Sequence, residues 1–223
     1  MKREPESEAF ESVAGPLEQR LSAGLAKIAL ATRHQLFHAA APHGLSPVQA
    51  QIQAALAEAP LTISQLASRL GLSAATISES VTALENKRLA KRTRLGRQVT
   101  VSATARGEKL GNDLALWPDF LGEAAAALSP AERIVLLRAV LSIIRSLIER
   151  GAVQESRMCP SCTYFRPNAH LGTDRPHHCA LADLPFGDSA LRLDCAEHSP
   201  AEPKFISANW KRFIKPASEE TRP

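Results

Sequence analysis

Four cysteines lie in the last third of this 223-residue chain, at a spacing that suits a metal centre. Cys159, Cys162, Cys179 and Cys195 form a C-x2-C-x16-C-x15-C series. Thiolates are soft ligands, so four of them favour zinc or an iron–sulfur cluster. In a reducing compartment such a group serves metal binding or redox chemistry more often than structural disulfides. We therefore predict a cysteine-rich metal-binding module over residues 151–200.

Three ligand sets are compatible with this region. The first is all-thiolate and uses the four cysteines. The second is a mixed zinc set in which His198 replaces Cys179, because Cys195 and His198 form a second pair at x2 spacing and paired ligands are typical of zinc sites. The third set brings in His178. Cys179 distinguishes the first two sets, since only the all-thiolate set needs it.

Composition limits the fold and the compartment. The mass of 24.1 kDa leaves room for one ordinary domain and a small appendage. Hydrophobic residues make up 44% of the chain but aromatic residues only 4%, which predicts an aliphatic core and favours helices. No apolar run approaches the roughly 20 residues that span a bilayer. Residues 1–15 are acidic and lack a hydrophobic signal core, so we predict a disordered arm and a cytoplasmic protein.

A long helix and a shorter one are predicted in the first quarter of the chain. Apolar residues recur at helical intervals over residues 16–41. Ser46 and Pro47 then supply an N-cap and a first-turn proline for a second helix, which ends near Ala59.

The next segment predicts two short helices joined by a tight turn. The first packs through Leu66 and ends at Gly71. Ser73 caps the second, whose apolar residues fall at i, i+4 and i+7 from Ile77. A capped helix with a small, polar outer face can enter the major groove of DNA, as in a helix-turn-helix. Its outer face consists of Ala75, Thr76, Ser78, Glu79 and Thr82.

Residues 89–103 change to the alternating pattern of strands and predict a hairpin, or wing. From Asn86 through Arg106 there are seven basic residues and no acidic one. Such a block attracts DNA phosphates whatever their sequence. Its position directly after a helix-turn-helix favours DNA binding over an ordinary solvated face.

Two more helices follow the hairpin. Thr104 caps the first, and Ser129 opens a strong helix that runs to Arg150. This last helix carries more apolar residues than a surface helix of a monomer needs, which predicts a homodimer.

Taken together, these motifs resemble the multiple antibiotic resistance regulator (MarR) family of winged helix-turn-helix transcription factors. The resemblance runs from about Leu45 to Leu110 and includes Leu-Thr-Ile-Ser-Gln-Leu-Ala and Leu-Gly-Leu-Ser-Ala-Ala-Thr-Ile-Ser. It implies a mainly α fold with a small β-hairpin wing over residues 16–150. Within it, residues 46–103 would form the DNA-binding lobe, and 16–41 with 104–150 the dimerisation helices.

The same resemblance implies a homodimer that binds double-stranded DNA at a pseudo-palindromic operator. The recognition helix would contact the major groove, and the wing would hold the backbone and the minor groove. The wing is short for the family, and Leu95-Gly96-Arg97 stands in place of its usual Asp-x-Arg tip. The implied DNA-contacting residues are Ser73, Thr76, Ser78, Thr82, Arg92, Arg94, Arg97 and Gln98.

Residues Met158 to His198 resemble the small 4Fe-4S domains of the high-potential type. In those, a Cys-x-x-Cys pair precedes two isolated cysteines, and an aromatic residue follows the pair, as Tyr164 does here. The resemblance implies a 4Fe-4S cluster as cofactor, with zinc as the alternative. An apolar shell would have to enclose the cluster. Its candidates are Pro160, Tyr164, Phe165, Pro167, Leu181, Leu184, Phe186, Leu191 and Leu193.

The remaining C-terminal residues have simpler interpretations. His170, His177 and His178 lie in a polar loop and are predicted to be surface residues. Residues 201–223 form a tail in which an amphipathic stretch around Trp210 and Phe213 is expected to dock on the body.

We expect from this sequence a transcription regulator, acting as a repressor, whose metal centre responds to redox state, oxygen, nitric oxide or iron. One alternative is a regulator that binds a small-molecule effector and uses zinc only structurally. Another is a cluster-bearing subunit for electron transfer or protein contacts. The chain shows no phosphate-binding glycine loop or nucleophile elbow, so we do not expect an enzyme.

Overall fold

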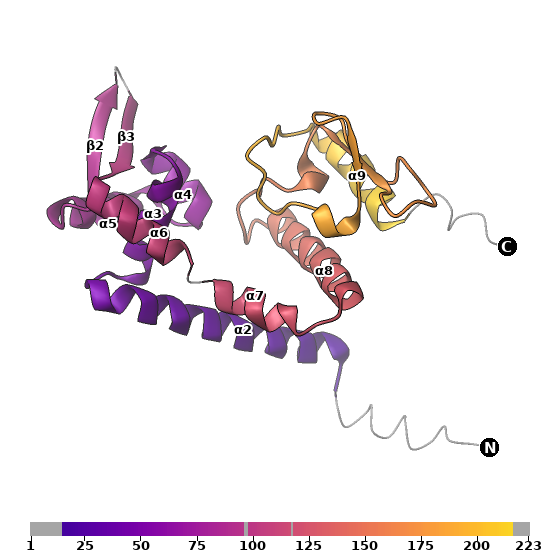
Figure 1. Cartoon of the computed structure of the whole chain (residues 1–223), viewed down its shortest axis with the longest axis horizontal. Coiled ribbons are helices and arrows are strands. Elements are labelled where there is room, and N and C mark those ends of the chain that lie inside the picture. Colours follow the sequence, from indigo (N-terminus) through magenta and orange to yellow (C-terminus); the bar gives the residue numbers. More distant parts are fainter. Residues whose placement is uncertain (1–14, 96–97, 117, 216–223) are drawn as a thin grey trace. The chain divides into compact units, whose positions relative to one another are not determined.

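The computed structural model describes residues 15–95, 98–116 and 118–215 (Figure 1). Its contacts divide the chain into two compact units, one that ends at Glu123 and one that begins at Ala124. In the described residues, no helix is long and apolar enough to cross a membrane.

The first unit is mainly helical. It consists of α2 (Leu17–Ala40), η1 (Ala41–His43), α3 (Pro47–Glu58), β1 (Leu61–Thr62), α4 (Ile63–Leu70), α5 (Ala74–Asn86), β2 (Ala90–Leu95), β3 (Gln98–Ala103) and α6 (Ala105–Ala115). Helix α7 (Asp119–Ala126) spans the boundary between the units.

Helix starts in both units follow the predicted caps. The side chains of Ser46, Ser73, Thr104 and Ser129 each accept a hydrogen bond from a backbone N–H three residues further on. Gly71 ends α4 in a left-handed conformation, with φ of 64°, which glycine adopts without steric cost. The predicted helix-turn-helix is therefore confirmed as α4 and α5.

The wing is the antiparallel hairpin of β2 and β3, which projects from the helices in Figure 1. A strand that we did not predict completes a three-stranded sheet in the order β1-β3-β2, with Leu61 opposite Val101. This pairing anchors the base of the wing beside the start of α4, because Thr62 is both the last residue of β1 and the N-cap of α4.

The core of this unit lies between α3, α5, α6 and the base of the sheet. Ile52, Leu66, Ile77, Val81, Leu84 and Val101 are fully buried there. Helix α2 contributes only Leu36 and Ala40 to the buried set. Its other large apolar side chains are exposed, namely Leu17, Leu21, Leu25, Ile28, Leu30 and Phe37.

The second unit combines α8 (Pro130–Glu149) with the cysteine-rich segment and α9 (Pro203–Ile214). Short elements lie between the helices: η2 (Cys159–Ser161), β4 (Phe165–Arg166), β5 (His177–Cys179), β6 (Leu184–Phe186) and η3 (Asp188–Ala190). The strands form an antiparallel sheet in the order β4-β5-β6. Its buried core is Leu141, Met158, Cys162, Phe165, Leu191 and Phe213.

The boundary between the units differs from the predicted one. We placed it after residue 150, but the structure places it between Glu123 and Ala124. The reason is that the apolar face of α8, centred on the fully buried Leu141, packs with the core of the cysteine-rich segment. Phe213 of α9 is only 1% exposed in the same core, so the predicted docking of this stretch is confirmed.

Candidate functional site

The exposed face of α5 carries the predicted major-groove residues. Ser73 caps the helix, and its Oγ accepts from the Thr76 N–H at 3.1 Å. Thr76 and Thr82 are exposed, whereas Ser78 is half-buried. The Thr82 hydroxyl donates to the Ser78 carbonyl at 2.9 Å. This face is small and polar, as a helix that enters a groove requires.

Arg92 reaches from β2 back to the recognition helix. Its guanidinium forms an ion pair with Glu85 and donates to the Ser78 carbonyl at 3.0 Å. It also lies 3.3 Å from Thr82 Oγ1. The Arg92 and Glu85 side chains are each 28% exposed. Arg92 therefore braces α5 against the wing, and its predicted contact with DNA stays a prediction.

Removing this brace should destabilise the first unit. We expect Arg92→Gln to lower the free energy of unfolding by about 1–3 kcal/mol, because it leaves the half-buried Glu85 carboxylate without its charged partner. Urea denaturation followed by circular dichroism measures this change. The matched control is Arg69→Gln, which removes a more exposed ion pair with Glu58 and should change stability by about 0–1 kcal/mol. Equal effects of the two substitutions would contradict the bracing role.

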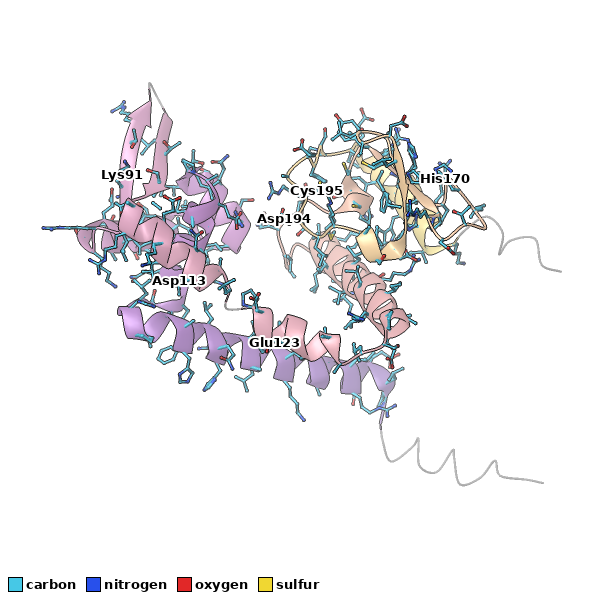
Figure 2. All side chains as sticks on the ribbon, in the orientation of Figure 1. Lys91, Asp113, Glu123, His170, Asp194 and Cys195 are labelled. Carbon is cyan, nitrogen blue, oxygen red and sulfur yellow. The ribbon has the colours of Figure 1, made fainter. Side chains whose placement is uncertain are left out.

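The rest of the wing presents a basic edge beside α5. Lys91 and Arg94 are exposed on β2, and Figure 2 labels Lys91 at the base of this strand. Arg97 lies outside the described residues, and so does the side chain of Gln98.

Backbone hydrogen bonds bring the four cysteines together in the second unit. The Cys159 N–H donates to the Arg192 carbonyl at 3.1 Å, and the Cys195 N–H donates to the Arg157 carbonyl at 3.0 Å. Cys162 pairs with Pro200 in a β-bridge. Cys179 ends β5, where it stands opposite Phe165 of β4. The segments that carry the cysteines are thus tied to one another.

All four cysteines line one cavity, with a volume of about 370 Å³. Most of the other lining residues are apolar, and five of them belong to the shell that we predicted. The shell members that line the cavity are Tyr164, Phe165, Leu181, Leu184 and Phe186. The thiols are free, with no disulfide among them.

The arrangement separates the three predicted ligand sets. Cys179 lines the cavity, whereas neither His178 nor His198 does. The His198 Nε2 instead lies 3.0 Å from Ser161 Oγ, and the His178 Nε2 lies 3.2 Å from Asp183. Figure 2 shows His170 on the opposite side of this unit from Cys195. The cavity lining therefore contains every residue of the all-thiolate set and neither of the two histidines, and the ligand set itself stays a prediction.

Within the described ranges, no group of three or more His, Cys, Asp or Glu side chains is placed to hold a metal ion. A single zinc ion requires all its thiolates within about 2.3 Å of one centre. In a 4Fe-4S cluster each cysteine binds a different iron, so the sulfurs stand around a larger body. Four thiols on the wall of an apolar cavity are the donors that such a cluster uses, and the choice between cluster and zinc stays a prediction.

Arg192 contacts two of these sulfurs. Its backbone N–H donates to Cys159 Sγ at 3.3 Å, and its guanidinium donates to Cys195 Sγ at 3.5 Å. Burial raises the pKa of the Cys159 thiol, and the charges of the other three cysteines raise it further, although the Arg192 N–H opposes both. Without a metal, Cys159 is thus held as a thiol, and a metal that binds it must displace the proton.

One residue of this unit lies where we did not predict it. His177 is fully buried, not a surface residue of a loop. Burial lowers its pKa, against the opposing effect of the Asp188 carboxylate, so the imidazole is held neutral. The adjacent His178 is half-buried. In a strand these two neighbours face opposite ways, which a loop assignment could not reveal.

The helix-turn-helix and wing described above can be compared with known proteins. Residues 43–99 match the MarR family. That segment runs from the end of η1 to the start of β3, so it contains α3, α4, α5 and β2. No curated protein matches the chain.

Several solved structures are similar to part of the chain. BldR from Sulfolobus solfataricus, a transcriptional regulator, has 24% identity over 58% of this chain and 95% of its own, with a TM-score of 0.47. YusO from Bacillus subtilis has 18% identity over 59% of this chain and 99% of its own, with a TM-score of 0.45. MepR, which regulates a multidrug efflux pump of Staphylococcus aureus, has 19% identity over 56% of this chain and 97% of its own, with a TM-score of 0.45.

The MarR match and the cysteine-lined cavity occupy different parts of the chain. The match ends at residue 99, and the cavity is lined by residues from Cys159 onward. The match therefore covers the helix-turn-helix and the first strand of the wing, whereas the cavity must be interpreted from its own chemistry.

Proposed function

We propose that this protein is a DNA-binding transcription regulator of the MarR type, acting as a repressor, and that a cysteine-bound 4Fe-4S cluster controls its binding. The observation that carries the first part is the polar, capped face of α5 beside the basic strand β2. The MarR match over residues 43–99 supports the same assignment. Thr76 and Thr82 would approach the bases, and Lys91 and Arg94 the phosphates.

A homodimer is part of this proposal. On α2, Leu17, Leu21, Leu25 and Ile28 recur every three or four residues, and each is at least 44% exposed. On α8, Val135 and Leu136 are exposed as well, although another face of this helix is buried. Contiguous apolar faces of this kind mark protein interfaces. A two-fold dimer would place two recognition helices on the two halves of a pseudo-palindromic operator.

The second part of the proposal rests on the cavity. Cys159, Cys162, Cys179 and Cys195 would hold the cluster, and the aromatic and aliphatic lining would shield part of it from water. When bound, the cluster would supply a redox couple and a sensitivity to oxygen, nitric oxide or iron shortage. The chain's own contribution is to bring three separate segments, which carry Cys159 with Cys162, Cys179, and Cys195, to one apolar site. Losing the cluster would release that tie, which is the differential stability that a switch needs.

The DNA-binding part is tested by fluorescence anisotropy with a duplex from the chain's own promoter region and a scrambled duplex of equal length. We expect tighter binding to the promoter duplex and a steep loss of affinity with salt. Arg94→Gln should flatten the slope of log affinity against log salt by about 1. The control, Arg133→Gln on α8, should leave the slope unchanged. Absence of binding to both duplexes, or binding that does not depend on salt, would refute the proposal.

A further inference from the structure

The buried His177 is held by a specific set of contacts. Its ring packs against Phe165, Phe186 and Phe213, with centroids 5.4 to 5.6 Å away. The Asn168 N–H donates to Nδ1 at 3.2 Å. Because Nδ1 accepts, the proton of the neutral ring is on Nε2, which therefore donates to Asp188 Oδ1 at 3.0 Å.

Asp188 has a second partner on α8. Arg138 Nη1 donates to the same carboxylate oxygen at 2.6 Å. The Arg138 Nη2 donates to the Phe213 carbonyl at 2.9 Å, and the guanidinium lies 4.2 Å from the centroid of the Phe213 ring. Asp188 thus joins His177 of β5 to α8, and Arg138 joins α8 to α9. We call His177, Asp188 and Arg138 the coupling network.

The coupling network lies directly behind one wall of the cysteine-lined cavity. Phe165 and Phe186, which pack on His177, both line the cavity. Phe186 and Ala190 line it on either side of Asp188 in the sequence. His177 itself stands opposite Phe186 in the β5–β6 pairing and two residues from Cys179. A change in what fills the cavity must therefore reach residues that the network holds.

We propose that the coupling network transmits the state of the cavity to α8. The inference rests on the proposed cluster. With the cavity filled, its wall is supported and Asp188 keeps both partners. Part of the cavity wall lies at the surface, since Leu181 is 48% and Leu184 61% exposed. Losing the cluster would remove the contacts that hold these apolar side chains, so the wall should rearrange when the cluster is lost.

Movement of the wall would change how Asp188 meets Arg138. Phe186 and Ala190 flank Asp188 in the sequence, so Asp188 would move with them. It could then no longer keep its hydrogen bonds to both His177 and Arg138. Breaking a partly buried ion pair leaves a charge without its partner, which favours a discrete rearrangement over gradual bending. The affected element is α8, whose exposed apolar residues belong to the proposed dimer interface.

Hydrogen exchange of the full-length protein tests this inference. In the wild type, removal of the cluster by anaerobic chelation should speed amide exchange over residues 134–148 by about tenfold. Asp188→Asn keeps the size of the side chain but not its charge. In this variant exchange should be fast with and without the cluster, so the ratio of the cluster-free to the cluster-loaded exchange rate should fall to about one. A purely structural role would speed exchange in both states and leave the ratio unchanged.

Two further variants make the result specific. Arg138 does not line the cavity, and its guanidinium donates to both Asp188 and the Phe213 carbonyl. A lysine cannot make both contacts in this geometry, so Arg138→Lys should behave like Asp188→Asn. Glu149→Gln breaks an ion pair with Arg145 on the same helix, outside the network, and should keep the wild-type ratio. The coupling alone is overturned if Asp188→Asn keeps a tenfold ratio of exchange rates between the cluster-free and loaded forms. It is also overturned if a wild type that holds iron shows a ratio of one. If the anaerobically purified wild type holds no iron, the proposed cluster is overturned as well.

Discussion

Replacing Cys179 with serine should prevent the protein from holding the proposed 4Fe-4S cluster. We expect the wild type, purified anaerobically, to be brown and to hold about four irons per chain, and Cys179→Ser to hold less than about one. The reason is that Cys179 is one of four thiols on the cavity wall, and a serine hydroxyl of similar size is not a soft ligand. Visible absorbance with iron and sulfide analysis measures the loss.

The matched control for this substitution is His198→Gln. His198 is the alternative ligand for zinc, but its ring contacts Ser161 and does not line the cavity. We therefore expect His198→Gln to keep the iron content of the wild type. A colourless wild type with one zinc per chain, lost in His198→Gln and kept in Cys179→Ser, would show that the mixed zinc set is correct.

A second large effect is expected in the first unit, at Gly107 of α6. A Cβ added there would lie 1.9 Å from the Leu89 carbonyl oxygen and 2.6 Å from Gln53 Nε2. The first of these atoms belongs to the backbone, so no change of rotamer relieves the overlap. Leu89 also accepts hydrogen bonds from the backbone and side chain of Thr104, which fixes its position.

We expect Gly107→Ala to lower the free energy of unfolding of this unit by roughly 3 kcal/mol, because α6 must move away from α3 and the wing base. This corresponds to a fall in melting temperature on the order of 10 °C. Thermal denaturation followed by circular dichroism measures it. Gly122→Ala on α7 is the control, since a Cβ there meets nothing within 4 Å. This control should be neutral or stabilise the unit by up to about 1 kcal/mol. Equal melting temperatures of the two variants would contradict the close packing of α6 against Leu89.

The helix-turn-helix could be predicted because its signals are local. Ser46, Ser73 and Thr104 each mark a helix start through a hydrogen bond to a residue three positions away. The inward residues of α5 follow from a 3.6-residue period. Strand β1 could not be predicted in the same way. It is two residues long and exists only because Leu61 meets Val101, which is forty positions further on.

The role of Arg92 was also outside the reach of the sequence. A basic residue on a wing suggests a phosphate contact, but the pairing of β2 with β3 places Arg92 beside Glu85 and Ser78 of α5. Which basic side chain of the wing meets α5 depends on this tertiary placement.

In the second unit, the cysteines line one cavity with five residues of the predicted shell, whereas Pro160, Pro167, Leu191 and Leu193 do not line it. The organisation around the cysteines could not be predicted. Spacing identifies Cys159 and Cys162 as neighbours, whereas the position of Cys179 depends on a three-residue strand with no recognisable period. The burial of His177 follows from rings contributed by β4, β6 and α9. The assignment of α8 to this unit has the same origin, since Leu141 is buried by residues later in the chain.

The measurement that tests the account most directly compares the DNA affinity of iron-loaded and iron-free protein. Both forms are titrated anaerobically at one salt concentration against the promoter duplex, with Cys179→Ser as a form that cannot be loaded. We predict that the affinities of the loaded and iron-free wild type differ by at least about tenfold, and that Cys179→Ser equals the iron-free form. Equal affinities of the loaded and iron-free wild type would contradict control of DNA binding by the cysteine centre.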